Sequence, residues 1–98
     1  MISYNKYVLS NGLRLLHHYN ATTQMVALNL RYDVGGRDES PERTGLAHLF
    51  EHLMFGGSLN APDFDGALQA AGGSSNAWTS NDCTNFYEVL PAHNIETA

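Results

Sequence analysis

The stretch His48–His52, with the sequence HLFEH, decides the expected fold because it lies inside the strongest helical pattern of the chain. Apolar residues recur over positions 45–55 at the spacing that lines one face of a helix. They are Leu46, Leu49, Phe50, Leu53 and Met54. Gly56 and Gly57 supply a stop, and Thr44 is the expected N-cap. The segment is therefore predicted to form a helix whose apolar stripe packs in a core.

Two histidines and a glutamate gather on the other side of this helix. At about 100° per residue, His48, Glu51 and His52 share one side, opposite the leucine stripe. Imidazoles on adjacent turns can bind one zinc ion, which lowers the pKa of a bound water to about 7, and an offset carboxylate can take that water's proton. This HxxEH spacing of the inverted zincins predicts His48 and His52 as metal ligands and Glu51 as the general base. A helix whose polar face happens to carry these residues is the alternative that the pattern leaves open.

The segments before the helix favour β-structure. Residues 7–19 hold two short β-prone runs around Ser10-Asn11-Gly12, which predicts a tight hairpin. Residues 25–36 alternate apolar and polar side chains, as in a strand with one buried face, and end at Gly35-Gly36. Residues 37–43 are charged and contain a proline, which predicts a loop. Four charged residues in and beside this loop are expected to be solvated: Asp33, Arg37, Asp38 and Glu39.

A second helix and two strands are expected after the motif. The helix should run from about Pro62 to Ala71, with Pro62 in its first turn and Gly72-Gly73 as its stop. Residues 76–90 are rich in threonine and aromatic residues and contain a turn signal at 80–82, which predicts two strands. The order β, β, β, α, α, β, β predicts an α+β fold, with helices packed on one face of a largely antiparallel sheet.

Composition limits the size and the partners. The 98 residues suffice for one domain and one core. Ten acidic against five basic residues give a net charge of −5, and the basic residues are scattered, which argues against nucleic acid as a partner. No apolar run has the length of a signal peptide or a membrane span, so a soluble protein without a membrane partner is expected. A single cysteine, Cys83, favours the cytoplasm over the periplasm.

Three motifs in this order carry a resemblance to a known family: VGGRDE from Val34, GLAHLFEHLMFGGS around the helix, and GGSSNAWTSNDCTNFYEVLP after it. With these motifs the chain resembles the pitrilysin or insulinase family of zinc metallopeptidases from Val34 onward. The resemblance implies a processing-peptidase-like metallohydrolase fold. It also implies a zinc endopeptidase or oligopeptidase that hydrolyses extended peptides through a zinc-bound water.

The resemblance assigns roles to individual residues. It implies that His48 and His52 bind one Zn²⁺ per motif and that Glu51 activates the water. It also implies that a strand of four residues pairs with the peptide substrate, namely Asn76, Ala77, Trp78 and Thr79. Edge-strand pairing recognises backbone more than side chains, so broad peptide specificity is expected.

The family's third zinc ligand is a glutamate whose position falls beyond Ala98. Residues 1–98 are therefore expected to be the truncated N-terminal part of one metallopeptidase domain, with the C-terminal half or a partner subunit missing. Alone, this piece should be inactive and should self-associate through exposed apolar surface. Two other functions stay open: a non-catalytic binding or scaffold subunit of a two-part peptidase, and an HxxEH lyase of related fold that uses a catalytic cysteine.

Overall fold

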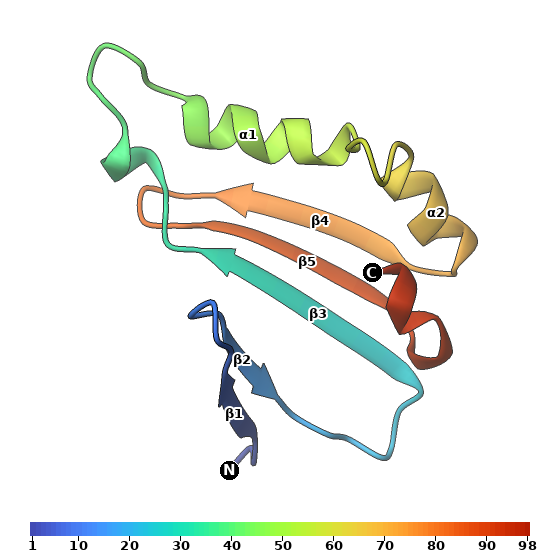
Figure 1. Cartoon of the computed structure of the whole chain (residues 1–98). Coiled ribbons are helices and arrows are strands. Elements are labelled where there is room, and N and C mark those ends of the chain that lie inside the picture. The colour runs from blue at the N-terminus through green and yellow to red at the C-terminus, as the bar shows by residue number, and fades with distance from the viewer.

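A three-stranded antiparallel sheet forms the centre of the computed structural model, which describes residues 1–98 (Figure 1). Its strands are β3 (Met25–Tyr32), β4 (Ser74–Thr79) and β5 (Thr84–Pro91). Their order is β3-β5-β4, so β5 is central and β4 lies at an edge. The predicted α+β class and the antiparallel pairing are confirmed.

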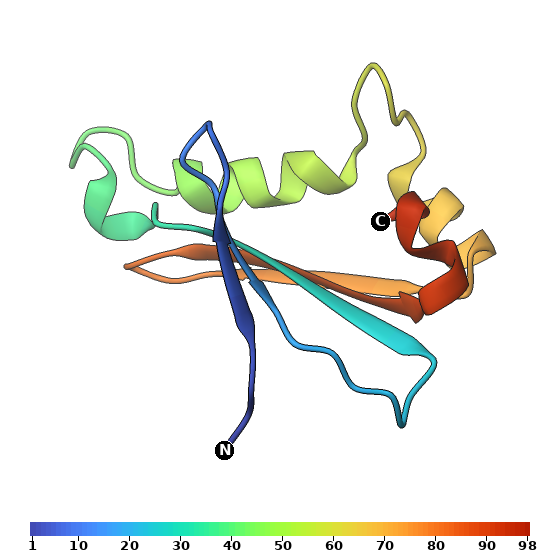
Figure 2. The same ribbon diagram turned by 60° about the horizontal axis from the view of Figure 1, so that its bottom comes forward.

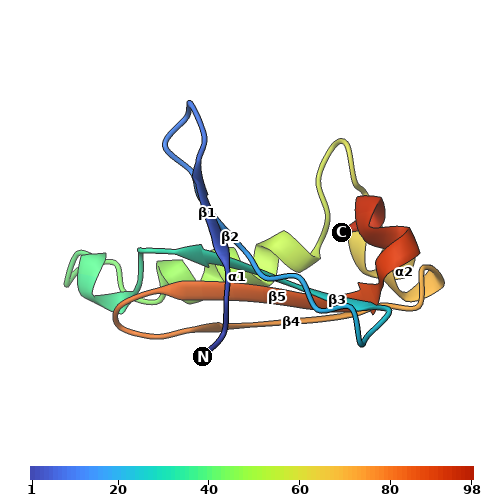
Figure 3. The same cartoon turned by 90° about the horizontal axis from the view of Figure 1, so that it is seen from below.

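The predicted N-terminal hairpin is confirmed as a separate two-stranded sheet of β1 (Asn5–Val8) and β2 (Arg14–His17). Its turn is closed by the N–H of Leu9, which donates to the carbonyl of Leu13 at 2.9 Å. Gly12 has φ 87°, the left-handed conformation expected of glycine in such a turn. The hairpin projects from the three-stranded sheet and adds no strand to it (Figure 3).

Two helices, α1 (Leu46–Phe55) and α2 (Phe64–Ala70), lie on one face of the larger sheet (Figure 2). Alternate residues of β4 face them and are half-buried, whereas the residues between are exposed. Two short 3₁₀ helices complete the chain: η1 (Gly36–Asp38) after β3 and η2 (Ala92–Thr97) after β5. None of the helices has both the length and the apolar content that crossing a lipid bilayer requires.

The fully buried core is small and lies under α2. Leu68 of α2 and Leu90 of β5 are both 0% exposed. Gly73 lies between them, where an added Cβ would come within 2.8 Å of Leu68 Cδ1 and 3.0 Å of Leu90 Cβ. Glycine is therefore needed for α2 to pack this closely on the sheet.

The apolar stripe of α1 does not pack in a core, so that prediction is wrong. The least exposed side chains of α1 are Ala47, Glu51 and Phe55, and these point at the sheet. The stripe residues are between 41% and 62% exposed: Leu46, Leu49, Phe50, Leu53 and Met54. Periodicity identifies residues that share a helix face but does not say which face meets the sheet. Here the sheet offers a hydroxyl to Glu51, which makes burial of that carboxylate possible.

Element boundaries differ from the prediction at both helix starts. The N-cap of α1 is Gly45, in the left-handed conformation, and not Thr44. The second helix begins at Phe64, because Asp63 is the N-cap and accepts a hydrogen bond from the Gly66 N–H at 3.1 Å. Pro62 therefore precedes the helix.

Candidate metal centre

The two histidines of the HLFEH motif come together on α1. His48 and His52 are one turn apart, and their Nε2 atoms are separated by 3.0 Å. Two nitrogen ligands of one tetrahedral zinc ion, each about 2.0–2.1 Å from the metal, lie roughly 3.3 Å apart. Both rings are exposed. The pair therefore has the donor atoms, the spacing and the access that a zinc ion needs.

Glu51 is buried between α1 and the sheet. Its side chain is only 7% exposed, and its Oε2 accepts a hydrogen bond from the hydroxyl of Thr79 at the end of β4. The sequence assigned these two residues to separate groups, one as the base and one as part of the peptide-binding strand. The structure brings them into direct contact across 28 positions of the chain.

The histidine pair has no third protein ligand within this chain, because no three His, Cys, Asp or Glu side chains are gathered at metal-binding distance. Glu88 lines a separate cavity of about 360 Å³ whose walls are mostly apolar, including Leu28 and Phe86. Its Oε2 is buried without a hydrogen-bond partner, and burial raises the pKa of Glu88 above its ordinary value. Glu88 is therefore a carboxylate in an apolar setting, in a cavity whose lining includes neither histidine of the pair.

The four residues predicted to bind peptide lie on β4, the edge strand (Figure 1). β4 pairs with β5 alone, so its second edge carries no strand. The N–H of Ala77 donates to the side-chain Oδ1 of Asn76 at 2.8 Å, and Trp78 is 47% exposed. The Asn76 side chain thus accepts a backbone hydrogen bond that a neighbouring strand would otherwise accept.

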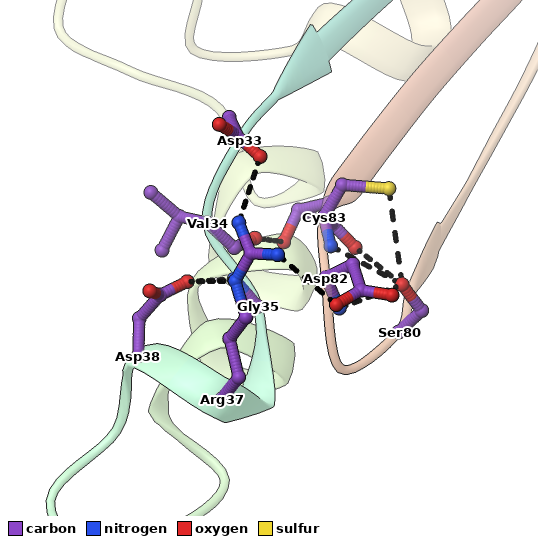
Figure 4. Close-up of polar contacts among 9 residues, drawn as sticks. Asp33, Val34, Gly35, Arg37, Asp38, Ser80, Asp82 and Cys83 are labelled. Carbon is purple, nitrogen blue, oxygen red and sulfur yellow. Dashed lines mark hydrogen bonds and ion pairs between the residues drawn. The ribbon is translucent and has the colours of Figure 1, made fainter.

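The predicted exposure of the loop before α1 holds for Asp33, Arg37 and Asp38, whereas Glu39 is half-buried. Arg37 also joins this loop to the β4–β5 turn (Figure 4). Its guanidinium contacts Asp33 at 3.0 Å, Asp82 at 3.1 Å and Asp38 at 3.7 Å. Asp38 contributes most to raising the pKa of Arg37 above its ordinary value. Asp82 lies 45 positions away in the chain. One cation therefore ties the end of β3, η1 and the distant turn together.

Backbone contacts dock the same loop closely on the turn. The N–H of Gly36 donates to the carbonyl of Ser80 at 3.0 Å, and that of Arg37 to the carbonyl of Asn81 at 2.9 Å. A Cβ on Gly35 would lie 2.4 Å from the Ser80 oxygen. The Gly35-Gly36 pair was interpreted as the end of a strand, but its absent side chains also permit this approach. That signal could have indicated a packed loop.

Glu39 contacts the first turn of α1. Its Oε2 accepts from the N–H of Gly45 at 2.6 Å and its Oε1 from the N–H of Ala47 at 2.8 Å. The Ala47 N–H contributes most, and the Gly45 N–H next, to lowering the pKa of Glu39 below its ordinary value. The sequence pattern does not reveal this contact, because Glu39 lies six residues before Gly45 rather than directly before the helix.

Known proteins match this chain over a region that contains the motifs described above. The profile of the family described as Insulinase (Peptidase family M16) matches residues 14–98. An uncharacterised zinc protease of Bacillus subtilis, YmxG, is 34% identical over 91 residues, which are 90% of this chain and 22% of that protein. The human insulin-degrading enzyme is 32% identical over 93 residues, which are 92% of this chain and 9% of that enzyme.

Solved structures agree in fold. The crystal structure of a protease from Helicobacter pylori superposes with a TM-score of 0.90 and 32% identity, covering 98% of this chain and 24% of that one. Pitrilysin superposes with a TM-score of 0.83 and 29% identity, covering 92% of this chain and 10% of that one. The chain thus spans less than a quarter of the length of each of these four proteins. Because the family profile matches most of its residues, this chain belongs to the insulinase family of peptidases, family M16.

Proposed function

We propose that the protein of which this chain is a part is a zinc-dependent peptidase, with His48 and His52 as metal ligands and Glu51 as the general base. The observation that carries the proposal is the pair of Nε2 atoms 3.0 Å apart on the helix that also carries Glu51. The relatives named zinc proteases support zinc as the metal. Copper or nickel would also accept imidazole, so metal analysis of the purified protein is part of the test.

A zinc ion held by the histidines would act as a Lewis acid and make a water molecule acidic enough to attack a peptide carbonyl near neutral pH. Glu51 accepts the proton of that water. The Thr79 hydroxyl engages Oε2 of Glu51, which leaves Oε1 as the oxygen for proton transfer. The hydrogen bond also fixes the carboxylate orientation, so that the base is held in place before substrate arrives.

The proposed substrate is an extended peptide that pairs with the open edge of β4 at residues 76–79. Such a peptide would take over the Ala77 N–H from the Asn76 side chain. The strand ends at Thr79, which contacts Glu51, so a peptide running along β4 is led to the base. Recognition through backbone groups suits many sequences, which favours an endopeptidase or oligopeptidase of broad specificity.

The metal site needs a further protein ligand, since catalytic zinc sites hold three. We propose a glutamate in the sequence that follows residue 98, in the remainder of the domain to which residues 1–98 belong. Further parts of the protein, or a partner subunit, would then close the site over the peptide. The short span of this chain relative to its relatives supports such a remainder.

The substitution Glu51→Gln in the whole protein tests the assignment. It removes the proton acceptor but keeps the shape and both imidazoles, so hydrolysis of an unstructured peptide should fall about 10²–10⁴-fold while zinc content stays at the wild-type level. Glu42→Gln is the matched control, because Glu42 is exposed and its side chain makes no hydrogen bond or ion pair. Wild-type hydrolysis in Glu51→Gln would refute the role of Glu51.

The two alternative functions predict different results. A scaffold subunit would show no zinc-dependent hydrolysis even in the wild-type protein. An HxxEH lyase would need Cys83 as a reactive thiol, but this side chain is 3% exposed and lies in the β4–β5 turn. Burial of Cys83 therefore favours the peptidase.

A further inference from the structure

The helix that carries the histidine pair has no cap of its own. Gly45 at its N-cap has φ 87° and no side chain, so the first N–H groups of α1 need acceptors from elsewhere. Glu39 provides them from six residues upstream. We propose that Glu39 is a positioning residue for the metal centre, one that fixes the first turn of α1 relative to β4. This inference rests on the proposed peptidase function.

The carboxylate of Glu39 spans two N–H groups of that turn. One oxygen accepts from Gly45 at 2.6 Å and the other from Ala47 at 2.8 Å. Hydrogen bonds to an ionised acceptor are short and strong, and the negative charge also suits the positive end of the helix dipole. Ala47 directly precedes His48, so the second bond holds the peptide unit just before the one that joins His48 to the helix.

Glu39 is itself fixed by the part of the loop docked on the β4–β5 turn. Its N–H donates to the carbonyl of Gly36 at 3.3 Å, and the N–H of Gly36 donates to Ser80 at 3.0 Å. Ser80 follows Thr79, the residue that holds Glu51. A continuous series of hydrogen bonds thus runs from the end of β4 through the loop to the start of the metal helix.

The chain between Glu39 and Gly45 supplies little other restraint. Residues 40–44 are exposed and are held only by two local hydrogen bonds to Ser40, from the Arg43 N–H to its carbonyl at 2.8 Å and from the Glu42 N–H to its hydroxyl oxygen at 3.4 Å. The Glu39 side chain joins the two ends of this short loop through its hydrogen bonds to the Gly45 and Ala47 N–H groups. Without it, the first turn of α1 is free to fray, and this turn carries His48 but not His52.

The expected consequence is a loss of catalytic competence that exceeds a loss of substrate binding. In the zinc-saturated whole protein, Glu39→Gln should lower kcat about 10-fold and raise the Kd for zinc about 10-fold, as for other residues that orient metal ligands. KM should stay within about twofold, because the peptide-binding edge of β4 is not altered. A residue that only stabilises the fold would lower the thermal midpoint without changing kcat of the zinc-saturated enzyme.

The experiment measures kcat, KM and zinc affinity, the last by competition with a chromophoric chelator, in wild type, Glu39→Gln and the control Glu42→Gln. Glu39→Asp is the conservative variant: it keeps the charge but is too short to span both N–H groups, so it should give intermediate values. It also serves if Glu39→Gln does not fold. Wild-type kcat and zinc Kd in either folded Glu39 variant would overturn the inference.

Failure of the proposed function is separable from failure of this inference. If the wild-type protein has no zinc-dependent hydrolysis, the peptidase proposal fails. Zinc affinity and amide hydrogen exchange then still test whether Glu39 positions the first turn of α1. The amides of Gly45 and Ala47 should exchange about 10-fold faster in Glu39→Gln, and unchanged exchange with unchanged zinc affinity would refute the positioning role.

Discussion

Two regions of this chain differ in how many contacts their side chains find within the chain. The polar end comprises the loop of residues 33–45, the first turn of α1 and the β4–β5 turn of residues 80–83. Except for Glu42 and Arg43, its charged side chains have partners, from Arg37 among three aspartates to Glu39 on the start of α1. The apolar flank comprises the outer side of α1 and the adjoining face of β3. Six of its large apolar side chains are between 37% and 62% exposed: Leu28, Leu30, Tyr32, Leu49, Phe50 and Leu53.

Two glutamates illustrate this difference. Glu39 at the polar end has a backbone donor for each carboxylate oxygen. Glu88 beside the apolar flank has a buried Oε2 with no partner. Contacts within the chain therefore fix the loop beside the histidine pair. On the flank, large apolar side chains stay exposed and the buried Glu88 Oε2 has no hydrogen-bond partner.

Breaking the metal centre should have the largest effect. His48→Ala in the whole protein removes one of two imidazoles, so zinc should be lost on dialysis and hydrolysis should fall more than about 100-fold, beyond the loss typical of residues that only orient ligands. His17→Ala, an exposed histidine on β2, is the control. Metal analysis and a peptide assay measure both, and a zinc-loaded, active His48→Ala protein would contradict the assignment.

The sequence predicted the proximity of the two histidines better than the contacts around them. The spacing of His48 and His52 was enough to place both rings together, because one helix carries both. The contacts that support them join distant segments, such as Arg37 with Asp82 and Glu51 with Thr79, and no local pattern contains that information. The apolar stripe of α1 was recognised, yet the prediction that it packs in a core is wrong.

Adding a side chain at Gly35, where the loop docks on the β4–β5 turn, should have the next largest effect. Gly35→Ala places a Cβ 2.4 Å from the Ser80 carbonyl oxygen, and backbone atoms cannot move aside cheaply, so about 3 kcal/mol of stability should be lost. Gly12→Ala in the hairpin turn meets no atom within 4 Å and should cost only about 1 kcal/mol for its positive φ. Urea unfolding of the two variants compares them, and equal losses would show that the loop is not tightly docked.

The apolar flank should make the isolated 98-residue chain self-associate. Replacing Leu53 by lysine removes an exposed leucine from the contact, worth about 1.5 kcal/mol, and should raise the dissociation constant about 10-fold. Gln24→Lys adds the same charge at an exposed position away from the flank and should have little effect. Sedimentation equilibrium provides the measurement. Monomeric wild-type chain, or equal effects of the two variants, would show that the flank is not the contact.

The smallest expected effect is a pH dependence of opposite sign at the two glutamates. The pKa of Glu39 is lowered from the ordinary value of 4.5, so Glu39 stabilises the fold above that pH and this contribution is lost as pH falls through its folded pKa. The pKa of Glu88 is raised, so its ionised form costs stability above the folded pKa and the cost disappears below 4.5. At pH 7, Glu39→Gln should therefore lower the thermal midpoint and Glu88→Gln should raise it.

The Glu88 difference from wild type should shrink as the pH falls from its folded pKa toward 4.5, and the Glu39 difference as the pH falls below 4.5 toward its folded pKa. In each window the wild-type carboxyl becomes protonated and resembles the amide. Glu42→Gln corrects for the loss of one negative charge from a chain of net charge −5. Thermal midpoints recorded from pH 7 down to about pH 3 follow the two variants. Shifts of the same sign at pH 7 would mean that the two carboxylates do not experience the opposite environments described for the polar end and the apolar flank.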